Sequence, residues 1–262
     1  GQLRHDTLGK SLITFILVLC IWTFIVHWSL VLPVTWRADP LAAALSTSLH
    51  HLLHGLLVYS LYRAVTTDPG FVPPPSVLQK QGSRGQAVAG FCDNWCLKCA
   101  HTRPSRAHHC KVCNRCVKKM DHHCLFVNNC VGAHNYKFFV LLLLYTVVGG
   151  AYNGAISYVW LGLHQRRGDN VLDLSRAMVV GNGCTIAVIA MILLPFVSVH
   201  MYLAGSNKTT LEALKGSGTD YDLGSVCRNL KHVFGANPFL WLSPFHNQIH
   251  QIHDTEPLLG MV

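Results

Sequence analysis

The chain has 262 residues, of which half are apolar and 13% are charged, and its formal net charge is +9. Soluble domains carry about a quarter charged residues, so this composition excludes an ordinary soluble globular protein and favours an integral membrane protein. We assign the excess of positive charge to a surface that faces anionic lipid, rather than to nucleic-acid binding.

Four apolar segments are each long enough to cross a bilayer core as a helix, which takes roughly 20 residues. They are residues 11–33, 41–62, 138–163 and 178–204. The second is diluted by serine, threonine and histidine, so an amphipathic helix on the membrane surface is the alternative there. The sequence therefore predicts an all-α integral membrane protein with four transmembrane helices, and a long loop between the second and the third.

Charge predicts how these helices are oriented. Lys and Arg far outnumber acidic residues between positions 65 and 137, so the positive-inside rule places that loop in the cytosol. Four spans then put both termini in the cytosol as well, as expected for a multi-pass membrane protein. The expected domains are the first two helices (1–64), the loop (65–137), the last two helices (138–204) and a cytosolic tail (205–262).

The loop concentrates cysteines: eight of the eleven in the chain lie between Cys92 and Cys130. The cytosol is reducing, so clustered cysteines and histidines indicate zinc ligands rather than disulfides. Few apolar residues are present here to form a core, and we expect bound metal to supply much of the stability of the loop.

Spacing suggests how the ligands divide. Cys-x2-Cys knuckles supply neighbouring corners of tetrahedral zinc sites, and they occur at Cys96/Cys99 and Cys110/Cys113. Cys113/Cys116 has the same spacing, so the pairing of knuckles stays open. One solution is two interleaved Cys3His sites. The first would use Cys96, Cys99, His109 and Cys116, and the second Cys110, Cys113, His123 and Cys130. His101, His108, His122 and His134 are alternative histidine ligands.

This solution leaves Cys92 and Cys124 over. Cys92 has no Asp-His neighbours and is interpreted as a spare thiol. Cys124 follows Asp121 and His122, the residue types that activate a nucleophile. The alternative is that Asp121 and His122 only support a zinc ligand. The residues by themselves leave both open.

Residues 96–135 resemble the cysteine-rich domain of the DHHC protein S-acyltransferases, or palmitoyltransferases. The matching motifs include the two knuckles, Asp121-His122-His123-Cys124 and Asn128-Asn129-Cys130. Three further motifs are similar to those of the family: Asp68-Pro69-Gly70, Thr209-Thr210-Leu211-Glu212, and a C-terminal segment that begins at Asn229. The resemblance implies two structural Zn2+ ions in a domain of short β-hairpins and loops, with the same ligand partition and Cys124 left free.

The resemblance also implies a two-step reaction. Cys124 would take a long acyl chain from acyl-CoA, such as palmitoyl-CoA, and pass it to cysteines of cytosolic or membrane-associated proteins close to the bilayer. His122 would act as the base and Asp121 would orient it. One departure is that Leu125-Phe126 stands where the family usually has Pro-Trp, which removes the fixed φ of proline next to Cys124.

Acyl-CoA would need cations for its phosphates and an apolar cavity for its chain. Arg103, Arg106 and Lys137 are candidates for the phosphates, although each is equally explained as membrane-facing charge. Gly149 and Gly150, in the third span, are expected to leave room at the end of the cavity. The alternative for this stretch is close helix packing through Gly150 and Gly154.

His50, His51 and His54 in the second span have two interpretations. They share helix faces and could form a polar or metal site, or they are simply histidines that face a wet cavity in the bundle. Two other function classes compete with an enzyme. A catalytically silent zinc-containing adaptor would recruit partners without chemistry, and a transporter would use the membrane histidines but leave the zinc ligands without a role.

Overall fold

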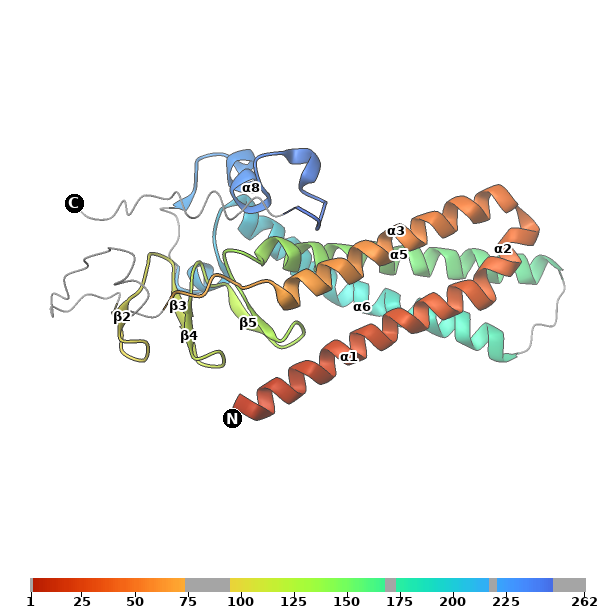
Figure 1. The fold of residues 1–262 in the computed structure, drawn as a ribbon. Helices are drawn as coiled ribbons and strands as arrows, with labels where there is room; N and C mark the ends of the chain where they lie inside the picture. Colours follow the sequence, from red (N-terminus) through yellow and green to blue (C-terminus); the bar gives the residue numbers. More distant parts are fainter. Residues whose placement is uncertain (1, 74–94, 168–172, 217–220, 247–262) are drawn as a thin grey trace. The chain divides into compact units, whose positions relative to one another are not determined.

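The computed structural model describes residues 2–73, 95–167, 173–216 and 221–246 (Figure 1). Contacts within the chain group into two compact units, which are described separately. The first unit contains residues 1–12, 63–139 and 203–262, and the second contains residues 13–62 and 140–202. Cys92 lies outside the described residues.

Four helical stretches of the described chain are long and apolar enough to cross a membrane, which confirms the predicted number, including the second. The first stretch comprises α1 (Gln2–Val26), the π-helical η1 (His27–Val31) and α2 (Leu32–Ala38). The others are α3 (Pro40–Thr66), α5 (Tyr136–Arg167) and α6 (Asp173–Gly205). Large apolar side chains on α1 and α6, such as Phe15 and Ile192, are exposed, as expected of surfaces that face lipid.

In the second unit, α5 and α6 pack closely because a glycine stands at their contact. A Cβ atom added at Gly150 would lie 2.5 Å from the Cβ of Ala190 and 2.9 Å from the carbonyl oxygen of Ile186. A Cβ added at Gly154 would lie 3.7 Å from the Cβ of Ala187, which is an ordinary contact. Gly150 therefore serves close helix packing, as the small-residue alternative predicts, and the cavity role expected of Gly150 is wrong. Gly149 differs, because a Cβ there would meet open space.

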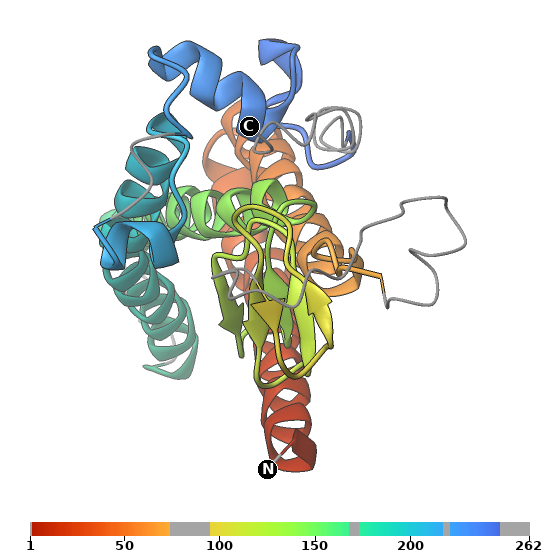
Figure 2. The ribbon, with the colours of Figure 1, turned by 90° about the vertical axis from the view of Figure 1, so that its left-hand side faces the viewer.

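The described residues of the first unit form three antiparallel β-hairpins and short helices. The hairpins pair β1 (Trp95–Cys96) with β2 (His101–Thr102), β3 (His108–Cys110) with β4 (Arg115–Val117), and β5 (His122–Cys124) with β6 (Asn129–Val131). The C-terminal part adds α7 (Thr210–Leu214), α8 (Val226–Phe234) and the 3-10 helix η3 (Pro238–Leu240). Figure 2 looks onto the hairpins, coloured yellow to green.

Candidate active site and metal centres

The three hairpins repeat one local structure. Cys96, Cys110 and Cys124 are equally spaced along the chain, and each ends the first strand of its hairpin. Each pairs with the residue five positions later, which is His101, Arg115 or Asn129. The turn residue just before that partner has a positive φ in all three hairpins: 53° at Ala100, 52° at Asn114 and 47° at Asn128. The same turn therefore presents the first cysteine in each hairpin.

The first group of ligands joins hairpins one and two. Cys96 and Cys99 come from the turn of the first hairpin, while His109 and Cys116 face each other across β3 and β4. His109 Nδ1 lies 3.2 Å from Cys99 Sγ, and Cys116 Sγ lies 3.7 Å from Cys99 Sγ. All four ligand atoms lie within 4.8 Å of one another. Three thiolates and one imidazole at such distances suit tetrahedral zinc.

The second group repeats this arrangement one hairpin later. Cys110 and Cys113 come from the turn of the second hairpin, and His123 and Cys130 face each other across β5 and β6. His123 Nδ1 lies 3.4 Å from Cys113 Sγ and 3.6 Å from Cys130 Sγ. The structure thus brings together the same two sets of four residues that the spacing suggested, and each set could hold a zinc ion.

Cys124 occupies the knuckle position of the third hairpin, but its hairpin has no second knuckle cysteine. Val127, which is fully buried, stands where Cys99 and Cys113 stand in the other two. Cys124 belongs to neither group of ligands, and its side chain is buried. The backbone N–H groups of Phe126 and Val127 donate to its sulfur. The turn around Cys124 therefore has the same conformation as the turns of the two metal knuckles. Its sulfur is not among the metal ligands and is left available for chemistry.

His122 and Asp121 stand next to this sulfur in a connected chain of hydrogen bonds. His122 Nδ1 donates to Asp121 Oδ2 at 2.7 Å, and the side chains of His122 and Cys124 are also hydrogen-bonded. The ring of Phe139 contacts the His122 ring edge-on, with centroids 5.1 Å apart. Asp121 is 1% exposed, so its carboxylate is held in a fixed orientation toward the imidazole.

Charge at the site favours a thiolate beside an imidazolium. Burial alone would lower the pKa of His122, but the hydrogen bonds and charges of Asp121 and Cys124 raise the pKa to about 9. Burial alone would raise the pKa of the Cys124 thiol, but His122 and the backbone N–H groups outweigh it and hold the pKa below its ordinary value. A thiolate is the reactive form of cysteine.

The segment after α6 supports Asp121. Thr210 donates its backbone N–H to Asp121 Oδ1 and its hydroxyl to Asp121 Oδ2, each at 2.8 Å. Thr209 caps α7, because its hydroxyl accepts from the N–H of Glu212 while the carboxylate of Glu212 accepts from the N–H of Thr209. This reciprocal capping box fixes the backbone from which Thr210 reaches the aspartate.

Arg106 lies in this supporting network rather than on an open surface. Its guanidinium forms a bidentate ion pair with Glu212, with both N···O distances at 2.7 Å, and donates to the carbonyl oxygen of Asn207. Both side chains of the ion pair are nearly buried, at 6% and 7% exposure. The structure therefore gives the donors of Arg106 partners within the protein, and its expected role in binding a phosphate stays a prediction.

Lys137 is likewise enclosed. Its ammonium donates to the carbonyl oxygens of Phe234, Leu240 and His246, at 3.3, 2.8 and 3.1 Å, and the residue is 1% exposed. The phosphate role of Lys137 likewise stays a prediction. Nearby, Arg63 donates to the carbonyl oxygen of Pro244. The two cations hold the C-terminal segment against the ends of α3 and α5 that belong to this unit.

Two other predicted motifs shape the backbone around the hairpins. Asp68 Oδ1 accepts from the N–H groups of Gly70 and Phe71, a turn in which Gly70 has a φ of 103°. Pro69 packs so tightly that a Cβ at Gly132 would lie 2.6 Å from its carbonyl oxygen. Asn229 is buried and donates to the carbonyl oxygen of Gly205 and to Asp222. These motifs serve structure in the described chain.

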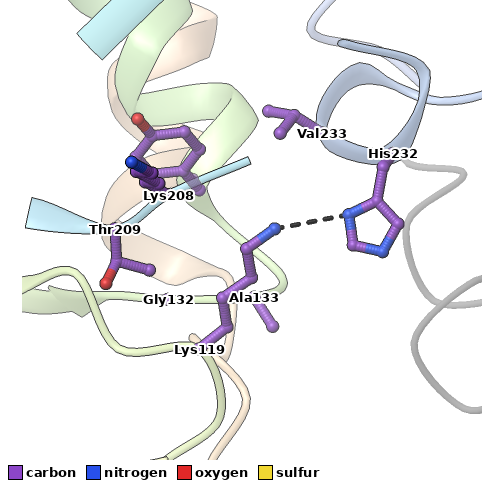
Figure 3. A pocket seen from close by; sticks show the side chains of 8 residues that line it. Lys119, Gly132, Ala133, Lys208, Thr209, His232 and Val233 are labelled. Atoms are coloured by element: carbon purple, nitrogen blue, oxygen red, sulfur yellow. Dashed lines mark hydrogen bonds between the residues drawn. The ribbon is translucent and has the colours of Figure 1, made fainter. Parts of the chain in front are cut away.

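The small pocket beside the network is lined by Lys119, Lys208, Thr209 and His232, among others (Figure 3). Lys119 Nζ lies 3.3 Å from His232 Nδ1 and donates to Asn207 Oδ1 at 2.7 Å. The pocket volume is about 10 Å³, which is room for a single water molecule and not for a phosphate group. Arg103, another cation predicted to bind acyl-CoA, is half-buried between β2 and β3.

Comparison with known proteins decides the family. A model of the family described as DHHC palmitoyltransferase matches residues 91–217. "Probable protein S-acyltransferase 14" of Arabidopsis thaliana is 35% identical over 239 residues, which cover 80% of this chain and 75% of that relative. The chain belongs to the DHHC palmitoyltransferase family. It is therefore a protein S-acyltransferase, as the motifs predicted.

Other DHHC relatives match over most of their lengths. "Probable protein S-acyltransferase 16" of Arabidopsis thaliana is 31% identical, with 93% of this chain and 88% of the relative covered. "Palmitoyltransferase ZDHHC15A" of Danio rerio is 32% identical, with 87% of this chain and 78% of the relative covered. The similarity therefore extends beyond the hairpins to the membrane helices of this DHHC protein.

Sequence reasoning missed two features of the DHHC site. The first is the contact of Thr210 with Asp121, which no local pattern indicates because the two residues are far apart in the chain. The second is the repeat that makes Cys124 a third knuckle. The equal spacing of Cys96, Cys110 and Cys124 could have revealed it, and so could the asparagines that follow Cys113 and Val127.

Proposed function

We propose that Cys124 is the nucleophile of this protein S-acyltransferase, and that it receives the acyl chain from acyl-CoA. The observation that carries the proposal is the hydrogen-bonded series Asp121–His122–Cys124, placed outside both groups of metal ligands. Zinc, when bound, supplies structure by tying the hairpins together. The residues of the third hairpin perform the chemistry.

In the first step the Cys124 thiolate attacks the thioester carbonyl of acyl-CoA. The new C–S bond to Cys124 forms as the C–S bond to coenzyme A breaks. The leaving thiolate takes the proton held on His122. Asp121 stays ionised and keeps Nδ1 of His122 protonated and oriented. The transferred proton is therefore the one on the other ring nitrogen, Nε2.

In the second step a cysteine thiol of a protein substrate gives its proton to the neutral His122. The resulting thiolate attacks the acyl-Cys124 thioester, and the Cys124 thiolate is released beside the imidazolium. The site thus returns to its starting state. Substrates would be cytosolic or membrane-associated proteins whose cysteines lie next to the bilayer. The reason is that His122 contacts Phe139, which lies in the first turn of the membrane helix α5.

The two halves of acyl-CoA would have different contacts. Arg103, Arg106 and Lys137 are candidates for the phosphates by their charge, although Arg106 and Lys137 already donate within the protein. Gly149 is the candidate for the cavity, supported by the open space next to it. The chain-length profile of Gly149→Tyr tests this. A shift toward shorter chains is expected, and an unchanged profile would reject the cavity role.

The nucleophile is tested with purified protein and labelled palmitoyl-CoA. Wild type should become labelled, and Cys124→Ser and Cys124→Ala should not, while the exposed tail variant Cys227→Ser should label like wild type. Full labelling of both Cys124 variants would refute the assignment. No labelling of wild type would favour the silent adaptor. Chelation of zinc should abolish labelling by unfolding the hairpins.

A further inference from the structure

The second unit contains a group of histidines that the acyl-transfer reaction does not use. His27 in η1 joins His50 and His54 of α3, and the three rings follow in series. The rings of His27 and His50 are stacked at a centroid distance of 4.0 Å, and those of His50 and His54 lie 5.6 Å apart. His27 is 3% exposed and His50 is 2% exposed. Sequence reasoning had grouped His50, His51 and His54, and had not included His27.

Two ring nitrogens in this group are left without a hydrogen bond. Among the residues that the structure describes, His27 Nδ1 and His50 Nε2 are buried and have no partner. His27 Nε2 lies 3.2 Å from the Thr47 hydroxyl, so whichever nitrogen carries the proton, one buried polar atom remains unsatisfied. Unpartnered buried polar atoms are costly and rare in proteins. They therefore point to a ligand.

His51 provides an internal comparison, because both of its nitrogens are satisfied. His51 Nδ1 lies 2.6 Å from the carbonyl oxygen of Thr47, and Trp28 Nε1 donates to His51 Nε2 at 3.1 Å. The neighbouring histidines of one helix thus differ: His51 is fully hydrogen-bonded, and His50 has a nitrogen to offer.

We propose that His27, His50 and His54 bind a divalent transition-metal ion of the zinc class. Imidazole nitrogen is a preferred ligand of such ions. His50 and His54 are four residues apart on one helical face, the spacing at which two histidines chelate a single metal. His27 supplies a third nitrogen from the neighbouring helix, and the fourth position is left for solvent.

The local backbone and an open groove suit this site. His27 begins the π-helical turn His27–Val31, and such turns inside α-helices are frequent at functional sites. A groove of about 570 Å³ is lined by Trp28, Trp36, Arg37 and Thr47, among others. Because Thr47 also contacts His27, the groove gives an ion a route to the rings. Binding would rotate the stacked rings apart, since a metal lies in the plane of each imidazole that it binds.

Zinc content of the full-length protein in phosphatidylcholine nanodiscs tests the proposal. After dialysis against micromolar free zinc, wild type should hold about three ions per chain, two of them in the cysteine sites. His27→Gln and His50→Gln should each hold about two, while His51→Gln, the matched control, should hold about three. A wild-type content of two, or a third ion retained in His50→Gln, would overturn it.

A second measurement guards against variants that misfold. Zinc X-ray absorption of wild type should show more nitrogen neighbours, at about 2.0 Å, than that of His50→Gln. The two cysteine-bound ions report that each variant is folded, because they require the intact hairpins. Identical spectra for the two proteins would contradict the site, whatever the total metal content.

Discussion

Thr210 and Asp121 are joined by two hydrogen bonds, one to each carboxylate oxygen, although they lie in different parts of the sequence. The second oxygen of Asp121 is shared with His122. The start of α7 thus fixes the carboxylate that orients the imidazole of His122. A residue that never reaches the acyl chain can therefore position the reacting atoms, and this makes Thr210 a positioning residue.

Replacing Thr210 with valine should slow autoacylation. Valine keeps the shape and the backbone N–H but removes the hydroxyl, a loss of about 1–2 kcal/mol or roughly 5- to 30-fold in rate if it is felt fully in the transition state. Thr210→Ser should restore most of the rate. The rate at which labelled palmitoyl-CoA acylates the protein measures this, and equal rates for the valine and serine variants would contradict a role for the hydroxyl.

The buried pair of Arg106 and Glu212 should dominate the stability of the C-terminal network. Removing one partner, as in Glu212→Gln, leaves a buried charge uncompensated and should cost about 3–5 kcal/mol. Thermal unfolding in detergent at neutral pH would show a lower midpoint. A matched control is Asp6→Asn, which breaks an exposed ion pair with Lys10 and should change stability by about 1 kcal/mol or less.

The same pair predicts how stability depends on pH. Burial would raise the pKa of Glu212, but the hydrogen bonds and charge of Arg106 outweigh it and hold the folded-state pKa below the ordinary value of 4.5. A group with a lowered pKa stabilises the fold above its unfolded pKa and loses that contribution as the pH falls through its folded pKa. The difference between wild type and Glu212→Gln should therefore shrink below about pH 4.5, and a constant difference would contradict it.

Local chemistry explains what the sequence could predict. The knuckles at Cys96 and Cys110 follow from spacing, because both cysteines of a knuckle lie in one turn, whereas spacing alone leaves open how the knuckles combine with the other ligands. The four spans follow from hydropathy, because a bilayer imposes length and composition on each helix separately. Both signals are contained within a short stretch of chain.

Long-range pairing explains what the sequence could not predict. Arg106 and Lys137 were assigned to phosphates because a cation in a sequence does not show its partner. The structure gives Arg106 a carboxylate and Lys137 three carbonyl oxygens. The inclusion of His27 in the histidine group has the same origin, since its neighbours lie on a different helix.

Lys137 should hold the C-terminal segment in place. Methionine at this position keeps a long unbranched side chain but leaves the carbonyl oxygens of Phe234, Leu240 and His246 without their shared donor. Bonds to a charged group contribute about 1.5–3 kcal/mol each, so Lys137→Met should loosen the segment. Backbone hydrogen exchange over residues 234–246 should rise, while exchange over the hairpins stays as in wild type. Unchanged exchange over 234–246 would exclude this role.

The first turns of α1 should hold the loop that follows Cys124. Asn128 donates to Asp6 Oδ1 at 2.9 Å, and a Cβ added at Gly9 would collide with the Asn128 side chain. Gly9→Ala should therefore shift this loop and slow autoacylation by about tenfold, for a strain of about 1–3 kcal/mol.

Rescue distinguishes that collision from general damage. Asn128 has a positive φ, which glycine adopts without strain, so adding Asn128→Gly should remove the collision and raise the rate above that of Gly9→Ala, although not to the wild-type rate, because the bond to Asp6 is lost too. Gly55→Ala is a matched control, because a Cβ there meets nothing within 4 Å. If the double variant stays as slow as Gly9→Ala, the collision is not the cause.

Val127→Cys should create a zinc-binding site at Cys124. The change completes a Cys-x2-Cys knuckle at the position that Cys99 and Cys113 hold in the other hairpins, on a turn of the same shape. Cys124, the new cysteine and His122 would offer three ligands, enough for a zinc ion with one open position. Bound zinc would remove the free thiolate, so autoacylation should fall at least tenfold in micromolar zinc and recover with a mild chelator.

Val140→Cys, a change of equal size at a buried position of α5, should not respond to zinc. If added zinc leaves the autoacylation rate of Val127→Cys unchanged, the third hairpin cannot bind metal as a knuckle. Its similarity to the other two hairpins would then be limited to the backbone.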